Sequence, residues 1–207
     1  MNPNRPLQSP QQRQRQRRRR GDLARPQVVI ARRGETVQSF GMAHEFTDSY
    51  LTDSARMLLY YKRLAERAMA QAADEALTSA LDAEGNSIAI IVKHMSGNMR
   101  SRWTNFLTTD GEKPDRNRDS EFEAPAATRA ELMAQWEAGW KYVFDALGAL
   151  TDADLGRTVL IRKEPHSVMQ AINRQVAHYS YHAGQIVFLA KHFAADRWMS
   201  LSMPRKK

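Results

Sequence analysis

The sequence predicts an all-α fold, a single bundle of four long helices. Four segments carry apolar residues at helical spacing, one every three or four positions. Two of these segments begin with a capping box, and no segment shows a convincing two-residue alternation of the kind that marks a half-buried strand. At 1.5 Å per residue the four segments are each about 30–40 Å long, so they can enclose one common core.

Apolar stripes predict the first two helices. The first helix covers about 49–76, and its stripe consists of Leu51, Ala55, Leu58, Leu59, Ala65, Met69 and Ala72. The second covers about 87–107, with a stripe of Ile88, Val92, Met95, Met99, Trp103 and Phe106. Each stripe gives its helix one face to bury against the others.

Capping boxes mark the start of the last two long helices. Thr128 and Glu131 open the third helix, which continues to about residue 147. Ser167 and Gln170 open the fourth, which runs to about residue 193. Between these helices, 151–155 is expected to form a short turn and 158–161 is compatible with a brief extended segment.

A long charged segment, 108–125, connects the second helix to the third. It contains nine charged residues within this range. Long ordered loops often have a functional role, and the alternative is a solvated loop with internal ion pairs. Arg116 and Arg118 in this loop are candidates to cover a site or contact a substrate.

The net charge of +8 is confined to the first 41 residues. Residues 1–41 contain ten arginines and only two acids, whereas 42–207 contain 21 basic and 21 acidic residues. The Arg- and Gln-rich tail cannot bury apolar surface, so we expect 1–41 to be a disordered extension and 42–207 to form the helical domain. The neutral domain gives no electrostatic reason to expect nucleic acid or an anionic membrane as a partner.

Two interpretations of the tail remain open beside nucleic-acid association. It is either a solvated extension or upstream sequence from an incorrectly assigned start, with Met42 as the initiator. No apolar stretch approaches the ~20 residues needed to cross a bilayer, and no signal-peptide pattern is present. These features predict a cytoplasmic protein with no membrane partner.

Three histidines form the candidate metal site. His178 and His182 are four residues apart, so they project from one face of the last helix, one turn apart. His94 is the only histidine inside another predicted helix, and it lies toward the middle of that helix, as the pair does in its own. A bundle can therefore bring all three to one depth. The alternative is a set of partly buried histidines hydrogen-bonded to neighbours.

The chain lacks cysteine, so a metal must be held by His, Asp or Glu. Three neutral imidazoles leave a coordination position open, as in catalytic zinc sites, and zinc or nickel is expected, with iron or manganese as alternatives. Asn98 and Gln185 are candidates to accept hydrogen bonds from the ligand rings. Arg102 and Arg174 flank the same helix faces and are candidates to hold an anionic substrate.

Seven stretches resemble a bacterial branch of the DinB/YfiT-like superfamily, a branch that is classed as a domain of unknown function. They cover 97–102, 106–114, 116–122, 164–168, 171–175, 178–186 and 201–204. Superfamily members are four-helix bundles with a His on the second helix and an HxxxH pair on the fourth. His94, His178 and His182 match these positions. The resemblance extends from residue 42 to about 204.

This resemblance implies a metal-dependent enzyme that acts on a small molecule. Characterised members of the superfamily include transferases and isomerases that use a low-molecular-weight thiol such as bacillithiol or mycothiol, and many form homodimers. The histidine triad carries over residue by residue, whereas thiol specificity carries over only by analogy.

Three functional hypotheses follow. The first is a divalent-metal-dependent enzyme, a thiol-dependent transferase or a hydrolase that attacks a small electrophile. The second is a non-catalytic metal-binding or interaction protein with a vestigial site. The third is nucleic-acid association through the arginines of the tail, which predicts binding that weakens steeply with salt.

Overall fold

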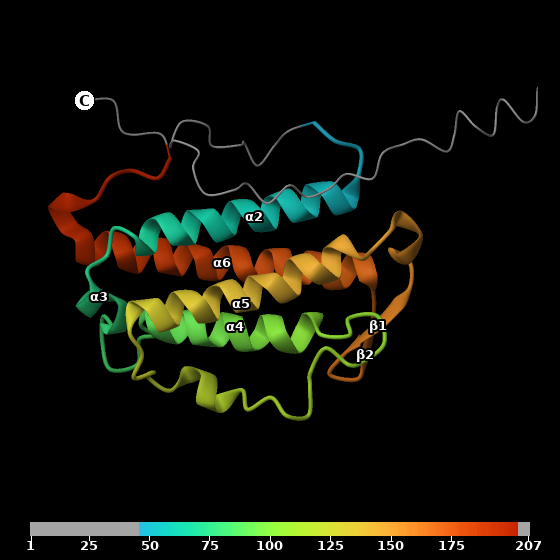
Figure 1. The fold of residues 1–207 in the computed structure, drawn as a ribbon, viewed down its shortest axis with the longest axis horizontal. Helices are drawn as coiled ribbons and strands as arrows, with labels where there is room; N and C mark the ends of the chain where they lie inside the picture. Colours follow the sequence, from blue (N-terminus) through green and yellow to red (C-terminus); the bar gives the residue numbers. More distant parts are fainter. Residues whose placement is uncertain (1–45, 203–207) are drawn as a thin grey trace, which may run out of the picture. The chain divides into compact units, whose positions relative to one another are not determined.

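The computed structural model describes residues 46–202, and these are mostly helical, as predicted. Four long helices dominate: α2 (Tyr50–Met69), α4 (Ile88–Trp103), α5 (Arg129–Gly148) and α6 (Val168–Ala194). Figure 1 shows them side by side, with α2 along α6 and α4 along α5. α4 also packs on α6, which is the contact that brings the predicted histidines together. The expectations for the tail, 1–41, lie outside the described residues, and the predicted boundary at residue 42 stays a prediction.

The core lies between the four helices and contains most of the residues of the predicted apolar stripes. Its largest fully buried side chains include Trp136 and Trp140 of α5, Tyr179 of α6 and Leu58 of α2. Burying a large apolar side chain stabilises a fold by about 1.5–3 kcal/mol, so this core accounts for the association of the helices. The two tryptophan rings meet edge to face at 5.6 Å, which adds a specific contact to the buried area.

Side-chain caps begin the long helices where the sequence predicts them. Both capping boxes form, at Thr128 with Glu131 and at Ser167 with Gln170. Ser49 and Ser87 cap α2 and α4 in the simpler way, by accepting a backbone N–H from the first turn. Each cap satisfies N–H groups that have no partner inside the helix.

The first predicted helix is shorter than expected, because α2 ends at Met69 and a separate helix, α3 (Asp74–Thr78), follows. The guanidinium of Arg129 at the start of α5 donates hydrogen bonds to the carbonyls of Met69, at 2.9 Å, and Ala72, at 2.6 Å. It also pairs with Asp74. A residue about 60 positions away in the sequence therefore caps α2, which is why local periodicity extended this helix too far. α4 likewise ends at Trp103, four residues earlier than predicted.

A two-stranded hairpin follows α5. The segment predicted to be extended forms β1 (Thr158–Ile161), and it pairs in antiparallel fashion with β2 (Glu164–Ser167), which the sequence did not predict. The turn residues Arg162 and Lys163 both have positive φ, 56° and 65°, as a tight two-residue turn requires. The Asp110 carboxylate accepts both of their backbone N–H groups, at 2.9 and 2.6 Å. This contact ties the charged loop to the hairpin.

Two short 3₁₀ turns, η1 (Asp119–Phe122) and η2 (Asp152–Asp154), lie in the segments before and after α5, and a third, η3 (Ala195–Arg197), follows α6. The turn η2 corresponds to the short turn predicted over 151–155. None of the helices in the described part of the chain is long and apolar enough to span a membrane.

Candidate metal centre

The three predicted histidines meet at the α4–α6 contact. His94 comes from α4, and His178 and His182 come from successive turns of α6. One ring nitrogen of each lies within 4.8 Å of the others. Nε2 of His178 is 3.4 Å from Nε2 of His94 and 3.1 Å from Nε2 of His182. His94 and His182 are buried and His178 is half-buried, so the cluster lies below the surface but is open on one side.

The opposite ring nitrogens of two histidines have their own acceptors. Nδ1 of His94 is 3.0 Å from Oε2 of Glu121, and Nδ1 of His182 is 2.8 Å from Oε1 of Gln185. Because carboxylate and amide oxygens only accept, these contacts place the ring protons on Nδ1. The Nε2 atoms of His94 and His182 therefore present lone pairs to the centre of the cluster.

Glu121 is the main residue of the site that the sequence analysis missed. It lies in η1, within the charged loop, and only 6% of its surface is exposed. Arg116 donates to both carboxylate oxygens, at 2.8 and 2.7 Å, and holds the group in place. Burial alone would raise the pKa of the Glu121 carboxyl, but the hydrogen bonds from His94 and Arg116 outweigh it and lower the pKa below its ordinary value.

Gly97 allows Glu121 to approach α4. A methyl carbon at position 97 would lie 2.2 Å from Oε1 of Glu121 and 2.7 Å from its Cδ, closer than any tolerated contact. Gly97 follows His94 by three residues, so it lies on the neighbouring helix face where the loop crosses. A glycine inside a strong helical pattern often marks such a close approach, and this was the signal available in the sequence.

Aromatic rings cover two of the imidazoles. The Phe122 ring lies 4.6 Å from the His94 ring, and the Tyr181 ring lies 4.1 Å from the His182 ring, measured between centroids. Tyr181 is 51% exposed, so it forms part of the outer rim of the site. The guanidinium of Arg118 lies 5.0 Å from the centre of the Phe122 ring and pairs with Asp119. The end of the charged loop thus covers the His94 side of the cluster.

The electrostatic environment keeps two of the histidines neutral. Burial, followed by the neighbouring His182 and His94, lowers the pKa of His178 to about 3. Burial, followed by the charge of His94 and opposed by the Gln185 hydrogen bond, lowers the pKa of His182 to about 4. Neutral imidazole is the form that binds a metal ion, so both rings are in the ligand state at pH 7.

A sequence model of a protein family matches residues 45–207, and that family is described as "Protein of unknown function (DUF1572)". The chain belongs to this family. A comparison with curated proteins finds no match. Because the DUF1572 description carries no activity, the function has to be argued from the chemistry of the site.

The structure also locates Asn98 and Arg174, two further predicted residues of this DUF1572 protein, and a substrate contact of Arg174 stays a prediction. Oδ1 of Asn98 accepts a hydrogen bond from the Tyr179 hydroxyl at 3.0 Å, and that hydroxyl accepts one from Nε1 of Trp103 at 3.0 Å. Asn98 thus belongs to a buried hydrogen-bond chain beside the cluster, where we had expected it to orient a ligand ring. Arg174 is exposed on α6.

Arg102 and Arg116 both lie in a network of ion pairs with the loop. Arg116 bridges Glu121 and Glu112 and so supports the partner of His94, whereas a contact of Arg116 with a substrate stays a prediction. Nη2 of Arg102 is 3.3 Å from Oε2 of Glu112, which also pairs with Arg162 at 3.0 Å. Ion pairs therefore join the charged loop to α4, so the loop is more than the solvated connection that was the alternative prediction.

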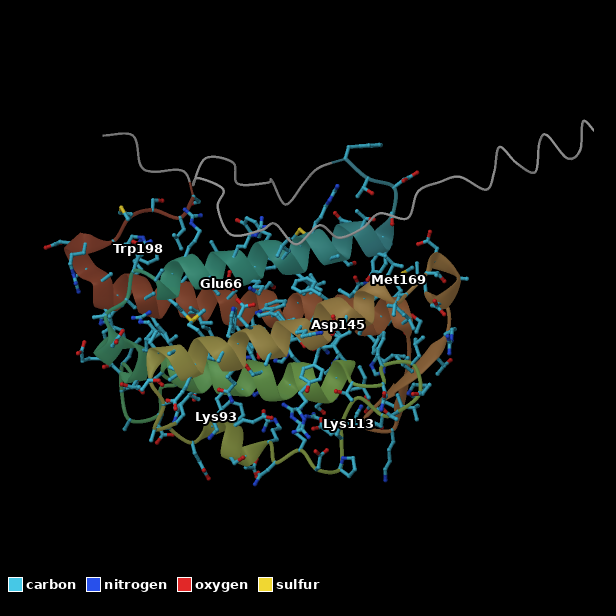
Figure 2. All side chains as sticks on the ribbon, viewed as in Figure 1. Glu66, Lys93, Lys113, Asp145, Met169 and Trp198 are labelled. Atoms are coloured by element: carbon cyan, nitrogen blue, oxygen red, sulfur yellow. The ribbon has the colours of Figure 1, made fainter. Side chains whose placement is uncertain are left out.

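A cavity of about 530 Å³ lies between α4 and the charged loop. Figure 2 labels Lys93, on α4, and Lys113, in the loop, which both line it. Arg116 and Glu121 form part of its wall. Arg116 and Glu121, which orient His94, therefore lie between the histidine cluster and this cavity.

Proposed function

We propose that His94, His178 and His182 bind one divalent metal ion, zinc or nickel, with iron or manganese as alternatives. The observation that carries the proposal is the convergence of three Nε2 atoms, two of them on rings whose Nδ1 atoms are held by Glu121 and Gln185. Zinc–nitrogen bonds of 2.0–2.1 Å in a tetrahedral site separate two nitrogens by about 3.3 Å. The two Nε2–Nε2 distances of 3.4 and 3.1 Å fit this geometry.

The donor set supports a metal more strongly than a hydrogen-bonded histidine cluster. With the protons of His94 and His182 held on Nδ1, the single Nε2 of His178 faces two lone pairs and can donate a proton to only one of them. At least one nitrogen–nitrogen contact then lacks a hydrogen. A cation at the centre satisfies all three lone pairs at once.

We propose that the protein is a metal-dependent enzyme of the DinB/YfiT-like four-helix-bundle type, a thiol-dependent transferase or a hydrolase acting on a small electrophile. Three histidine ligands leave a position open, and a divalent metal supplies a Lewis acid that lowers the pKa of a thiol or water. The chain has no cysteine, so a thiol nucleophile must come from a low-molecular-weight cosubstrate. The exposed Tyr181 offers an apolar surface at the rim for the substrate.

The residues behind the histidines have positioning roles in this proposal. Glu121 and Gln185 fix the tautomers and ring planes of His94 and His182, and hydrogen-bonded partners of this kind raise the basicity of the ligand rings. Arg116 holds Glu121 in register. The loop thereby contributes to the metal site although it supplies no ligand itself.

The second candidate is a metal-binding protein without catalytic activity. The rings of Phe122 and Tyr181, which lie tilted against two of the imidazoles, favour it because these side chains restrict access to the cluster. A metal with an exchangeable water and a measurable turnover of thiol or ester probes supports the enzyme. A closed coordination shell and no turnover support the binding protein.

Elemental analysis of the full chain, purified without added metal or chelator, tests the metal site. We expect about one equivalent of metal in the wild type and none in His178→Ala. His192→Ala is the matched control, because His192 is an exposed histidine farther along the same helix. Circular dichroism verifies that both variants remain helical. Unchanged metal content in a folded His178→Ala protein would exclude the triad as the ligand set.

A further inference from the structure

Arg102 is a buried cation with unused hydrogen-bond donors. Only 5% of its surface is exposed, and its Nη2 makes a long contact of 3.3 Å to Glu112. Its Nε and Nη1 are fully buried and find no acceptor among the described residues. Buried charged groups are normally paired and hydrogen-bonded, so two free donors on one guanidinium call for an acceptor from outside the chain.

Gln175 of α6 has a buried hydrogen-bond acceptor that is unused among the described residues. It is 3% exposed, and its Oε1 finds no donor within the described part of the chain. Gln175 precedes His178 by three residues, so the two side chains lie on the same side of α6. This unused acceptor therefore lies one helical turn from the histidine cluster.

Arg102 and Gln175 occupy the same level of the α4–α6 contact. The two helices run in opposite directions there, because His94 meets His182 and His178 while Asn98, one turn later in α4, meets Tyr179. Continuing one more turn along α4 reaches Arg102, and stepping back one turn along α6 from Tyr179 reaches Gln175.

The charged side chains around Arg102 carry an excess of positive charge. Those that interact with Arg102 or with its partner Glu112 comprise four cations and two anions, namely Arg102, Lys113, Arg116 and Arg162 with Asp110 and Glu112. A bound divalent metal next to this group would increase the excess. A small anion offsets part of it.

We propose that Arg102 and Gln175 form a subsite for a small 2-hydroxy carboxylate, whose carboxylate accepts from Arg102 and whose hydroxyl donates to Oε1 of Gln175. The arrangement matches the chemistry: charged donors suit a carboxylate, and a lone acceptor beside them suits a neutral donor on the next carbon. An amino group is a poorer partner than a hydroxyl, because its charge would add to the positive excess. The role of this ligand as the substrate rests on the proposed metal-dependent function.

Nitrogen-15 NMR of the arginine Nε–H groups in the full-length, metal-free protein tests the subsite. The Arg102 resonance is identified by its loss in Arg102→Met. The probes are glycolate, acetate and inorganic phosphate. We expect glycolate to shift this resonance saturably, about five- to tenfold more tightly than acetate because of one additional hydrogen bond. Phosphate that binds more tightly than glycolate would overturn the assignment of the subsite to a carboxylate.

Two variants separate the roles of the residues. Gln175→Met keeps the volume but removes the acceptor, and it should lower glycolate affinity to that of acetate. Arg63→Met, which removes an exposed arginine on α2, should leave glycolate binding unchanged. If Arg102→Met does not fold, the Gln175→Met comparison still decides, with Arg63→Met as the folded control and the Arg102 resonance identified as the slowly exchanging Nε–H group that persists in Arg116→Met.

Several outcomes would overturn the subsite. These are an Arg102 resonance unmoved by glycolate at 100 mM, equal affinities for glycolate and acetate, or unchanged glycolate binding in Gln175→Met. Cross-peaks from this N–H to a bound water, with no displacement by glycolate, would show that water satisfies the donors.

The failure of this inference is distinguishable from failure of the proposed function. The titration uses metal-free protein, so it reports on the anion subsite alone. Glycolate binding that persists in His178→Ala while metal uptake is absent from the wild type would keep the subsite and refute the metal site. Normal metal uptake without glycolate binding would keep the metal site and refute the subsite.

Discussion

Gly97→Ala is the sharpest test of how the loop supports the metal centre. The added methyl carbon would meet Oε1 of Glu121 at 2.2 Å and its Cγ at 3.2 Å, so the carboxylate must move by on the order of 1 Å to restore an ordinary contact. A displacement of this size breaks either the 3.0 Å hydrogen bond to His94 or the two-point contact with Arg116. In the first case His94 loses the partner that fixes its tautomer, and in the second case Glu121 loses the guanidinium that holds it against His94.

Two magnitudes follow from this displacement. Overpacking a buried site costs about 1–3 kcal/mol, and replacing a helical glycine with alanine returns about 1 kcal/mol, so the net change in unfolding free energy is small, about 0–2 kcal/mol of destabilisation. The affinity for the metal should fall about 10- to 100-fold, because the outer hydrogen-bond partner of a ligand histidine is lost. The loss of metal affinity is therefore the decisive observable.

Competition with a chromophoric chelator measures the metal affinity, and urea unfolding of the metal-free protein measures stability. Gly184→Ala is the matched control, since Gly184 is also helical but a methyl carbon there has no neighbour within 4 Å. The control should gain about 0.5–1 kcal/mol of stability and keep its metal affinity. Wild-type metal affinity in a folded Gly97→Ala protein would refute the argument that Glu121 orients His94.

Three further substitutions test contacts that hold the site in place. Asp110→Asn should destabilise the protein by about 1 kcal/mol at pH 7, because the carboxylate accepts the two N–H groups of the hairpin turn. Burial raises the pKa of the Asp110 carboxyl, but these backbone hydrogen bonds outweigh burial and lower it. The stabilisation by Asp110 should therefore be constant above about pH 4 and disappear at lower pH. Urea unfolding at pH 7, 5 and 3 measures the difference in stability between the wild type and Asp110→Asn, and a difference that grows on acidification would contradict this account. Tyr179→Phe removes the hydroxyl that joins two buried groups and should cost about 2–4 kcal/mol, whereas Tyr142→Phe at an exposed ring should cost under about 0.5 kcal/mol by the same measurement. Arg129→Met should cost about 1–3 kcal/mol and increase hydrogen exchange at the end of α2, and unaltered exchange there would show that the arginine does not cap this helix.

Local patterns predicted the helices well because their causes are local. The apolar residues of the α5 stripe are three or four positions apart, and the two residues of each capping box are three positions apart. Each of these patterns appears in the structure as predicted. The HxxxH spacing is equally local, since helical geometry alone places His178 and His182 on successive turns of one face. The place of Gln185 behind His182 follows from the same geometry, three residues along α6.

The prediction failed where an element depends on contacts that lie outside the helical pattern. The end of α2 depends on Arg129, about 60 residues away, and the second strand of the hairpin depends on pairing with the first. Glu121 lies 27 residues from His94 in a loop with no periodic pattern, so nothing local indicated which of its many acids would reach the site. Arg116 pairs with Glu112 and Glu121, four and five residues away, but a loop without a regular period does not indicate which of its acids lie within reach of one arginine.

The sequence by itself determined that the protein is mostly helical, that two histidines share one face of the last helix and that any metal must be held without cysteine. These properties follow from periodicity, capping and composition, which act over one or two helical turns. Only the tertiary structure decided that His94 joins the pair, that Glu121 and Gln185 fix the rings and that Arg102 keeps two donors unused. Those facts depend on how α4 packs on α6 and on the path of the charged loop, which are set by many weak contacts between distant residues.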